Sequence, residues 1–148
     1  MSPRGSSRVV SCTPAEARGR REQAKAFIDV AEMVLSEPAS QTDPHVAAAL
    51  AVLAAIAATD AICGLQLGRY SRGQDHDSAA VLLDTVDLPD QTLPAKLRRV
   101  LASKDNVHYS PHLISTTAAQ TLVRQARVLV DAAERLQPLA TAGVHKEV

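Results

Sequence analysis

The stretch DPHVAAALAVLAAIAATDAICGLQLG, residues 43–68, decides the fold of this 148-residue chain. Asp43 followed by Pro44 indicates the start of a helix, and Gly68 indicates its end, because proline fits the first helical turn and glycine suits the position after the last one. Between these signals the residues are apolar on nearly every side of a helix. A helix of this kind is typical of the middle of a bundle.

Four further segments have the hydrophobic spacing of amphipathic helices. The first opens with TPAE, a capping box with proline in the first turn, and the last opens with a serine cap. We expect KDNVHYSPHLIS, residues 104–115, to be irregular. The four predicted helices run from Thr13 to Pro38, from Asp75 or Asp77 to Val86, from about Pro94 to Ser103, and from Ser115 to Pro138.

The composition agrees with a helical bundle. Hydrophobic residues make up 46% of the chain but aromatic residues only 2%, so the core must consist of Ala, Leu, Val and Ile. We find no series of alternating β-branched runs bounded by turns, and therefore expect no sheet. The predicted fold is all-α, a single up-and-down bundle of about five helices spanning residues 13–138. Residues 1–12 and 139–148 are predicted to be flexible ends.

The sequence predicts a cytoplasmic protein without a membrane segment. The first residues, MSPRGSSRVVSC, are basic and polar and lack the apolar run of a signal peptide. The apolar stretch Val46–Ala58 ends at Thr59 and Asp60, before the ~20 residues that a bilayer span requires. Cys63 lies in the same apolar helix, and we expect it to be a buried thiol.

Motifs for metals and cofactors are missing from the sequence. A di-iron bundle needs Glu followed by His three residues later, and no Glu here has that spacing. His108 and His112 have the spacing of a metal pair, but Pro111 between them argues against one continuous helix. There is no phosphate-binding glycine loop, CxxC pair or serine nucleophile elbow. We therefore predict neither a metal nor a cofactor.

Asp60 is the most informative polar residue, because a buried carboxylate costs several kcal/mol unless it is paired. We expect it to have a partner. One interpretation is a structural hydrogen bond to a neighbouring helix or to the side of Arg69. The other is that Asp60 lines a polar pocket in the bundle and binds a ligand.

A second candidate site follows in RYSRGQDH, where Arg69 and Arg72 lie close in sequence to His76. An arginine that binds a phosphate and a histidine that moves a proton are the minimum for metal-free RNA cleavage by the neighbouring 2′-hydroxyl. The alternative is structural: Asp75, His76 and Asp77 form only the polar first turn of a helix.

Four segments then follow one another in an informative order. They are AAIAATDAI (54–62), GRYSRGQDHDSAAVLL (68–83), KLRRVLASKDNVHYSPHLIS (96–115) and AAQTLVRQARVLVDAAE (118–134). In this order they resemble a HEPN domain, the nucleotide-binding helical module named for higher eukaryotes and prokaryotes. The resemblance covers about residues 44–137, and it implies a HEPN-like bundle.

Catalytic HEPN members are similar to one another in a motif of Arg, four to six residues, then His, and they usually dimerise so that two motifs face one groove. Arg69 and His76 have six residues between them and match this spacing. In the later segment KDNVHY, Lys104 stands where Arg would be, and only three residues separate it from His108. The resemblance therefore implies a homodimer whose catalytic activity is uncertain.

Our first functional hypothesis is a non-catalytic HEPN-like binding module. Asp60, Arg72 and Tyr109 are its candidate ligand-binding residues. The resemblance implies a nucleotide or RNA as ligand, or a protein partner such as a nucleotidyltransferase, in a toxin–antitoxin or phage-defence setting.

The alternative hypothesis is a metal-independent endoribonuclease at a homodimer groove. Its candidate residues are Arg69 or Arg72 with His76, or Lys104 with His108 and Tyr109. Binding is favoured, because the few aromatic residues provide almost no platform for stacking bases. In addition, a net charge of zero provides no broad field that attracts a polyanion.

Overall fold

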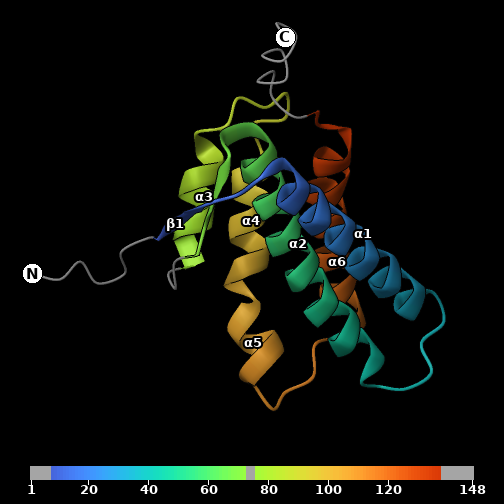
Figure 1. Cartoon of the computed structure of the whole chain (residues 1–148). Coiled ribbons are helices and arrows are strands. Elements are labelled where there is room, and N and C mark those ends of the chain that lie inside the picture. The colour runs from blue at the N-terminus through green and yellow to red at the C-terminus, as the bar shows by residue number, and fades with distance from the viewer. Residues whose placement is uncertain (1–7, 73–75, 138–148) are drawn as a thin grey trace, which may run out of the picture.

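Residues Asp43–Leu67 form α2, the central helix of the computed structural model, which describes residues 8–72 and 76–137 (Figure 1). Five helices of nine or more residues and one helix of six residues are described. The predicted all-α bundle is thereby confirmed. The other helices are α1 (Pro14–Ser36), α3 (His76–Asp84), α4 (Leu93–Ala102), α5 (Lys104–Tyr109) and α6 (Thr116–Arg135).

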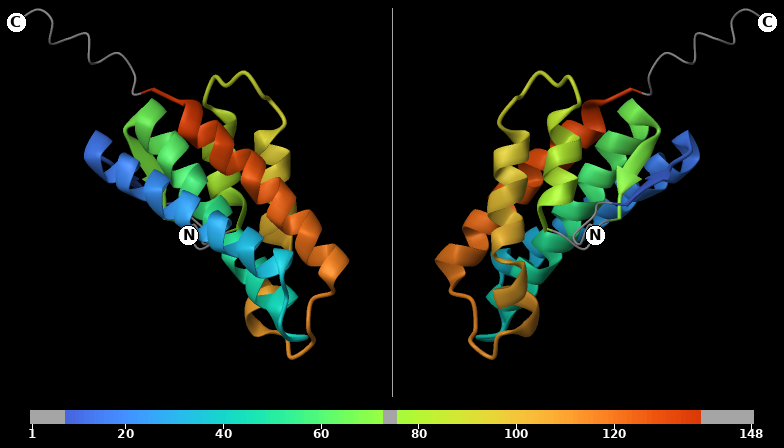
Figure 2. Two further views of the ribbon diagram at one scale, coloured as in Figure 1. Left: turned by 90° about the vertical axis from the view of Figure 1, so that its right-hand side faces the viewer. Right: turned by 90° about the vertical axis from the view of Figure 1, so that its left-hand side faces the viewer.

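Small side chains allow α2 to lie at the centre of the bundle. It packs against α1 and α6, and also against α3, α4 and α5. Alanines such as Ala54, Ala57 and Ala61 are completely buried, so neighbouring helices approach its backbone closely. Figure 2 shows α1, α2 and α6 running side by side, with α3 and α4 packed together beside them.

The apolar character of α2 raises the question of a membrane segment. By length and hydropathy α2 could cross a bilayer, and it is the one such helix among the described residues. However, 72% of its most apolar window is buried inside the bundle. That burial is typical of the core helix of a soluble protein.

The helix ends follow the predicted capping signals. At the start of α1 the backbone N–H of Glu16 donates to the Thr13 hydroxyl, and the N–H of Thr13 donates to the Glu16 carboxylate. The Ser115 hydroxyl accepts from the N–H of Ala118 at the start of α6. Gly68 ends α2 with a φ of 71°, a left-handed conformation that glycine adopts without strain.

A short ribbon of two strands is the main departure from the predicted fold. Strand β1 (Val9–Ser11) pairs antiparallel with β2 (Arg69–Ser71), which follows directly after Gly68. Cys12 is buried, so the ordered chain begins before the predicted start at Thr13. The expectation of no strands was therefore wrong at this point. Three residues are too few for an alternating pattern, which explains why the sequence did not indicate them.

Helix α5 is the second departure, because this stretch was expected to be irregular. It is one and a half turns long and ends two residues before Pro111. Its single buried side chain, Val107, packs into the main core. One buried residue cannot produce a helical period, so the hydrophobic pattern did not reveal the helix.

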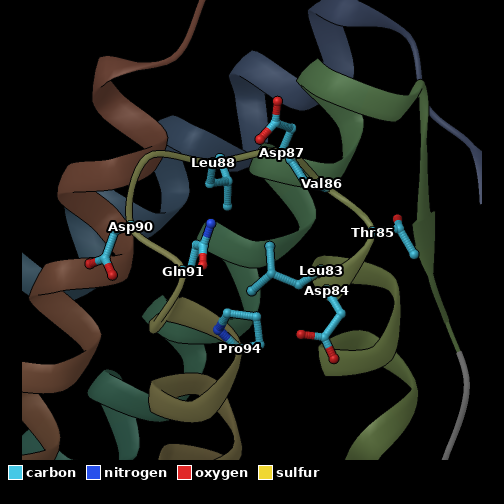
Figure 3. A pocket seen from close by; sticks show the side chains of 9 residues that line it. All are labelled: Leu83, Asp84, Thr85, Val86, Asp87, Leu88, Asp90, Gln91 and Pro94. Carbon is cyan, nitrogen blue, oxygen red and sulfur yellow. The ribbon is translucent and has the colours of Figure 1, made fainter.

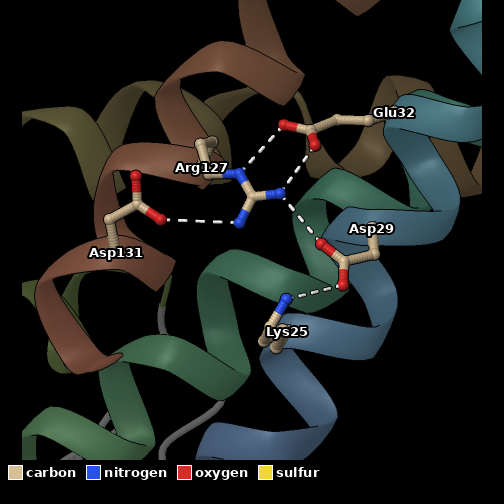
Figure 4. Close-up of polar contacts among 5 residues, drawn as sticks. All are labelled: Lys25, Asp29, Glu32, Arg127 and Asp131. Carbon is tan, nitrogen blue, oxygen red and sulfur yellow. Dashed lines mark hydrogen bonds and ion pairs between the residues drawn. The ribbon is translucent and has the colours of Figure 1, made fainter. Parts of the chain in front are cut away.

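An ion network joins α6 to α1 and accounts for several charged residues (Figure 4). The guanidinium of Arg127 donates to Glu32 at 2.6 and 2.9 Å, to Asp29 at 2.9 Å and to Asp131 at 3.4 Å. Lys25 donates to the other oxygen of Asp29. Hydrogen bonds from Lys25 and Arg127 lower the pKa of Asp29. Because these carboxylates are paired across the helices, we assign the network to packing rather than to a ligand site.

Candidate functional site

Asp60 is the one charged side chain that is buried in the described part of the chain. The Nε and Nη2 atoms of Arg20, on α1, both donate to its Oδ2 atom, at 3.1 and 2.8 Å. The Nη1 atom of Arg20 donates to Gln23 at 2.6 Å. The expectation that Asp60 has a partner is confirmed, and that partner comes from the neighbouring helix. These contacts also fix the orientation of the Arg20 guanidinium, whose side chain is 31% exposed.

Burial raises the pKa of Asp60, while the hydrogen bond and charge of Arg20 and the charge of Arg72 lower it. Burial and the two arginines thus have opposite effects on the pKa of Asp60, and the effect of burial is the larger one. Arg72 acts on Asp60 through its charge, without a hydrogen bond between the two side chains in the described part of the chain. In the described residues the second oxygen, Oδ1, accepts no hydrogen bond.

The ribbon brings further arginines to this end of the bundle. Arg69 begins β2, and the N–H of Arg72 donates to the carbonyl of Arg8 at 2.6 Å. Tyr70 lies between them and packs against the core. Arg8, Arg69 and Arg72 are exposed, and their side chains make no hydrogen bond within residues 8–72 and 76–137. We call Arg8, Arg20, Arg69 and Arg72 the arginine cluster.

The arginine cluster has the chemistry of an anion site. A guanidinium presents several N–H donors in one plane and matches the oxygens of a phosphate or carboxylate. Arg20 acts on Asp60 by hydrogen bonds, Arg72 acts on it by its charge, and Arg69 acts on Cys63, one turn further along α2. Positive side chains therefore gather at this end of the bundle, although the whole chain is neutral. Since Arg20 is already held in place by Asp60, it loses little side-chain freedom when an anion binds.

The structure tests only in part the two predicted combinations, Arg69 or Arg72 with His76 and Lys104 with His108 and Tyr109. His76 is the first residue of α3, but its side chain lies outside the described residues, so its position relative to Arg69 is not defined. Ser71 and Ser78, whose hydroxyls are 3.0 Å apart, join the ribbon to α3.

The later combination lies elsewhere in the bundle. Lys104, His108 and Tyr109 belong to α5, which packs at the start of α2, whereas Asp60 is near its end. His45 and Asp60 are separated by about 22 Å along that helix. Tyr109 is 77% exposed and its ring lies 6.1 Å from that of His108. Thus the structure does not bring Lys104, His108 and Tyr109 together with Asp60.

A crevice of about 420 Å³ lies at the loop between α3 and α4 (Figure 3). Three carboxylates line it, those of Asp84, Asp87 and Asp90, and Figure 3 shows them pointing away from one another. Arg98 donates to Asp84 at 3.1 Å. The acidic lining is unsuited to a phosphate, and within the described residues no group of His, Cys, Asp and Glu could hold a metal ion.

Both cysteines are buried next to the arginine cluster but are poorly suited to chemistry. Burial raises the pKa of Cys63 to about 12, and it also raises the pKa of Cys12. A thiol must lose its proton to act as a nucleophile. Cys63 is therefore an inert packing residue, as the sequence predicted.

Two residues of the site were missed in the sequence. Arg20 lies in line with Ala17, Ala24 and Ile28, the buried stripe of α1, and a charge in that line could have indicated a partner for Asp60. Arg8 gave no such signal, because its position depends on the ribbon.

Comparison with known proteins provides no further guide. A scan against protein-family models, a search of curated proteins and a search of solved structures found no significant match.

Proposed function

We propose that this protein is a HEPN-like, non-catalytic binding module that holds a phosphate group of a nucleotide or short RNA in the arginine cluster. The observation that supports the proposal is the Arg20 guanidinium, fixed by a buried Asp60 at the end of the bundle where the ribbon carries the exposed Arg69 and Arg72. In this proposal Asp60 orients Arg20, and the two exposed arginines supply the contacts to the phosphate. We place the protein in the cytoplasm, where nucleotides and RNA are available.

A short ligand fits better than a long one. The chain has zero net charge and 2% aromatic residues, so a long single strand would find neither a wide positive surface nor a row of rings for its bases. One or two phosphates need only the local donors of the cluster. A nucleotidyltransferase as protein partner, in a toxin–antitoxin or defence setting, is the corresponding proposal for its biological context.

Binding can be measured by fluorescence anisotropy with a labelled ten-residue single-stranded RNA and with nucleoside triphosphates as competitors. We expect Arg72→Gln to raise Kd about tenfold or more, because a hydrogen bond to a charged group is lost. Affinity should fall with rising salt, since each contacted phosphate releases counterions. Arg99→Gln is the matched control, because Arg99 is exposed on α4, outside the cluster, and its loss should leave Kd unchanged.

The same RNA can be used to distinguish a module that only binds RNA from the alternative, an endoribonuclease that cleaves it. Incubation in EDTA should leave it intact if the module only binds. Products with a 2′,3′-cyclic phosphate, formed by wild type and lost in both His76→Ala and Arg69→Ala, would contradict the non-catalytic proposal. Equal Kd values for wild type and Arg72→Gln would contradict the proposed site instead.

A homodimer is part of the proposal, and apolar side chains on two helices supply a surface for it. Val46 and Leu53 of α2 and Val30 of α1 are 46%, 39% and 44% exposed. Light scattering at low micromolar concentration should report twice the chain mass of 15.7 kDa. A constant mass of one chain up to high concentration would contradict the dimer.

A further inference from the structure

His45 joins three separate parts of the chain through its imidazole ring. Its Nε2 atom lies 2.6 Å from the backbone oxygen of Val107 in α5. Its Nδ1 atom lies 3.1 Å from the backbone nitrogen of Ile114, just before α6. A single side chain in the first turn of α2 therefore holds both α5 and the segment 110–114.

The backbone partners define the tautomer of this ring. A carbonyl oxygen can only accept, so Nε2 must have the proton and donate it to Val107. A backbone N–H can only donate, so Nδ1 must be unprotonated to accept from Ile114. Both contacts require the neutral imidazole with its proton on Nε2.

Protonation is incompatible with this arrangement. A second proton on Nδ1 would point at the N–H of Ile114 and would replace an attraction by a repulsion between two donors. The bond from Nε2 to Val107 would remain, because the protonated ring still donates from Nε2. Loss of the bond to Ile114 would thus weaken the attachment of the segment 110–114 and not that of α5.

We propose that His45 is a pH-sensitive latch, which holds the segment 110–114 against α2 when neutral and releases it when protonated, while its bond to α5 is kept. Because the bonded form is neutral, the attachment is present at higher pH and is lost as the pH falls. Histidine ordinarily changes its charge between about pH 5 and 8, a range that cells use for signalling.

The charged and titratable groups nearest to His45 in the sequence of these elements lie on α2, on α5 and on the segment after α5. They are Asp43, Lys104, Asp105, His108 and His112, and none makes a hydrogen bond or ion pair with the His45 ring. Two of these groups, His108 and His112, are histidines like His45. These two residues are therefore the ones that the experiment must separate from His45.

Hydrogen exchange of the Ile114 amide tests the latch in the full-length protein. Between about pH 7.5 and pH 5, its protection factor, which corrects for the intrinsic exchange rate, should fall about tenfold, the effect of one lost hydrogen bond. His45→Asn keeps an oxygen near the place of Nδ1 but does not titrate, so its protection should stay constant. His108→Asn and His112→Asn should retain the wild-type fall.

Two outcomes would overturn the proposal. One is wild-type protection of Ile114 that does not change with pH, and the other is the same fall in His45→Asn. If His45→Asn does not fold, the ¹⁵N chemical shifts of the His45 ring in wild type provide an independent test of the tautomer. They should report a protonated Nε2 and a bare Nδ1 at neutral pH, and the opposite tautomer would exclude the latch.

Discussion

Replacement of Gly64 by Ala should lower the free energy of unfolding by about 2 kcal/mol, although alanine is the better helix former. A Cβ atom at this position would lie 2.6 Å from the Sγ of Cys12 and 2.8 Å from the Cβ of Ala17. The methyl group of Ala17 is fixed by the backbone of α1. Cys12 is tied down by its N–H, which donates to the carbonyl of Gly68 at 2.9 Å. The clash can be relieved only by moving α1 away from α2.

Gly19→Ala is the matched control, because the same change in α1 meets nothing within 4 Å. There the helix propensity of alanine should act alone and stabilise by about 0.5–1 kcal/mol. Urea unfolding followed by circular dichroism measures both variants. If Gly64→Ala were as stable as Gly19→Ala, α1 and α2 would not be in the close contact described here.

Asp60→Ala should destabilise the protein by about 1–3 kcal/mol, because it removes the acceptor of two hydrogen bonds from Arg20. Arg20 is partly exposed and can regain water, which keeps the loss below that of a fully buried pair. Urea unfolding at neutral pH gives the value. Stability equal to that of wild type would show that the ion pair contributes nothing to folding.

The pH dependence adds a second test of Asp60. Because burial raises its pKa, the folded state favours the protonated carboxyl more than the unfolded state does. The resulting stability is present at low pH and is lost as the pH rises above about 4, the ordinary value for aspartate. As the pH rises above about 4, the free energy of unfolding of wild type should therefore fall relative to that of Asp60→Asn, which does not titrate. A gain instead would mean that the pairing with Arg20 outweighs burial.

The sequence predicted the helices well wherever a strong local signal was present. The capping box at Thr13, the proline after Asp43 and the serine cap at Ser115 each placed a helix start within a residue or two. The ribbon and α5 were not found, because each is short and depends on contacts with distant residues. Burial of Asp60 was predictable from its apolar neighbours, since a helix at the centre of a bundle is enclosed on most sides.

The candidate site was harder to predict, because its geometry joins residues far apart in the sequence. Arg20 and Asp60 are forty residues apart, and Arg8 reaches Arg72 only through the ribbon. His45 was not singled out at all, since its role depends on two backbone groups rather than on a motif. Local patterns reveal which residues are unusual, whereas the fold determines which of them meet.

A nuclear magnetic resonance titration tests the central proposal, phosphate binding at the arginine cluster, most directly. A nucleoside triphosphate is added to ¹⁵N-labelled wild type and to Arg72→Gln, and backbone amide shifts are followed. We predict that shifts in wild type concentrate in β1, β2 and the first turns of α1, that they saturate, and that they weaken in the variant. No shifts at millimolar nucleotide, or shifts centred on α5 instead, would contradict the proposal.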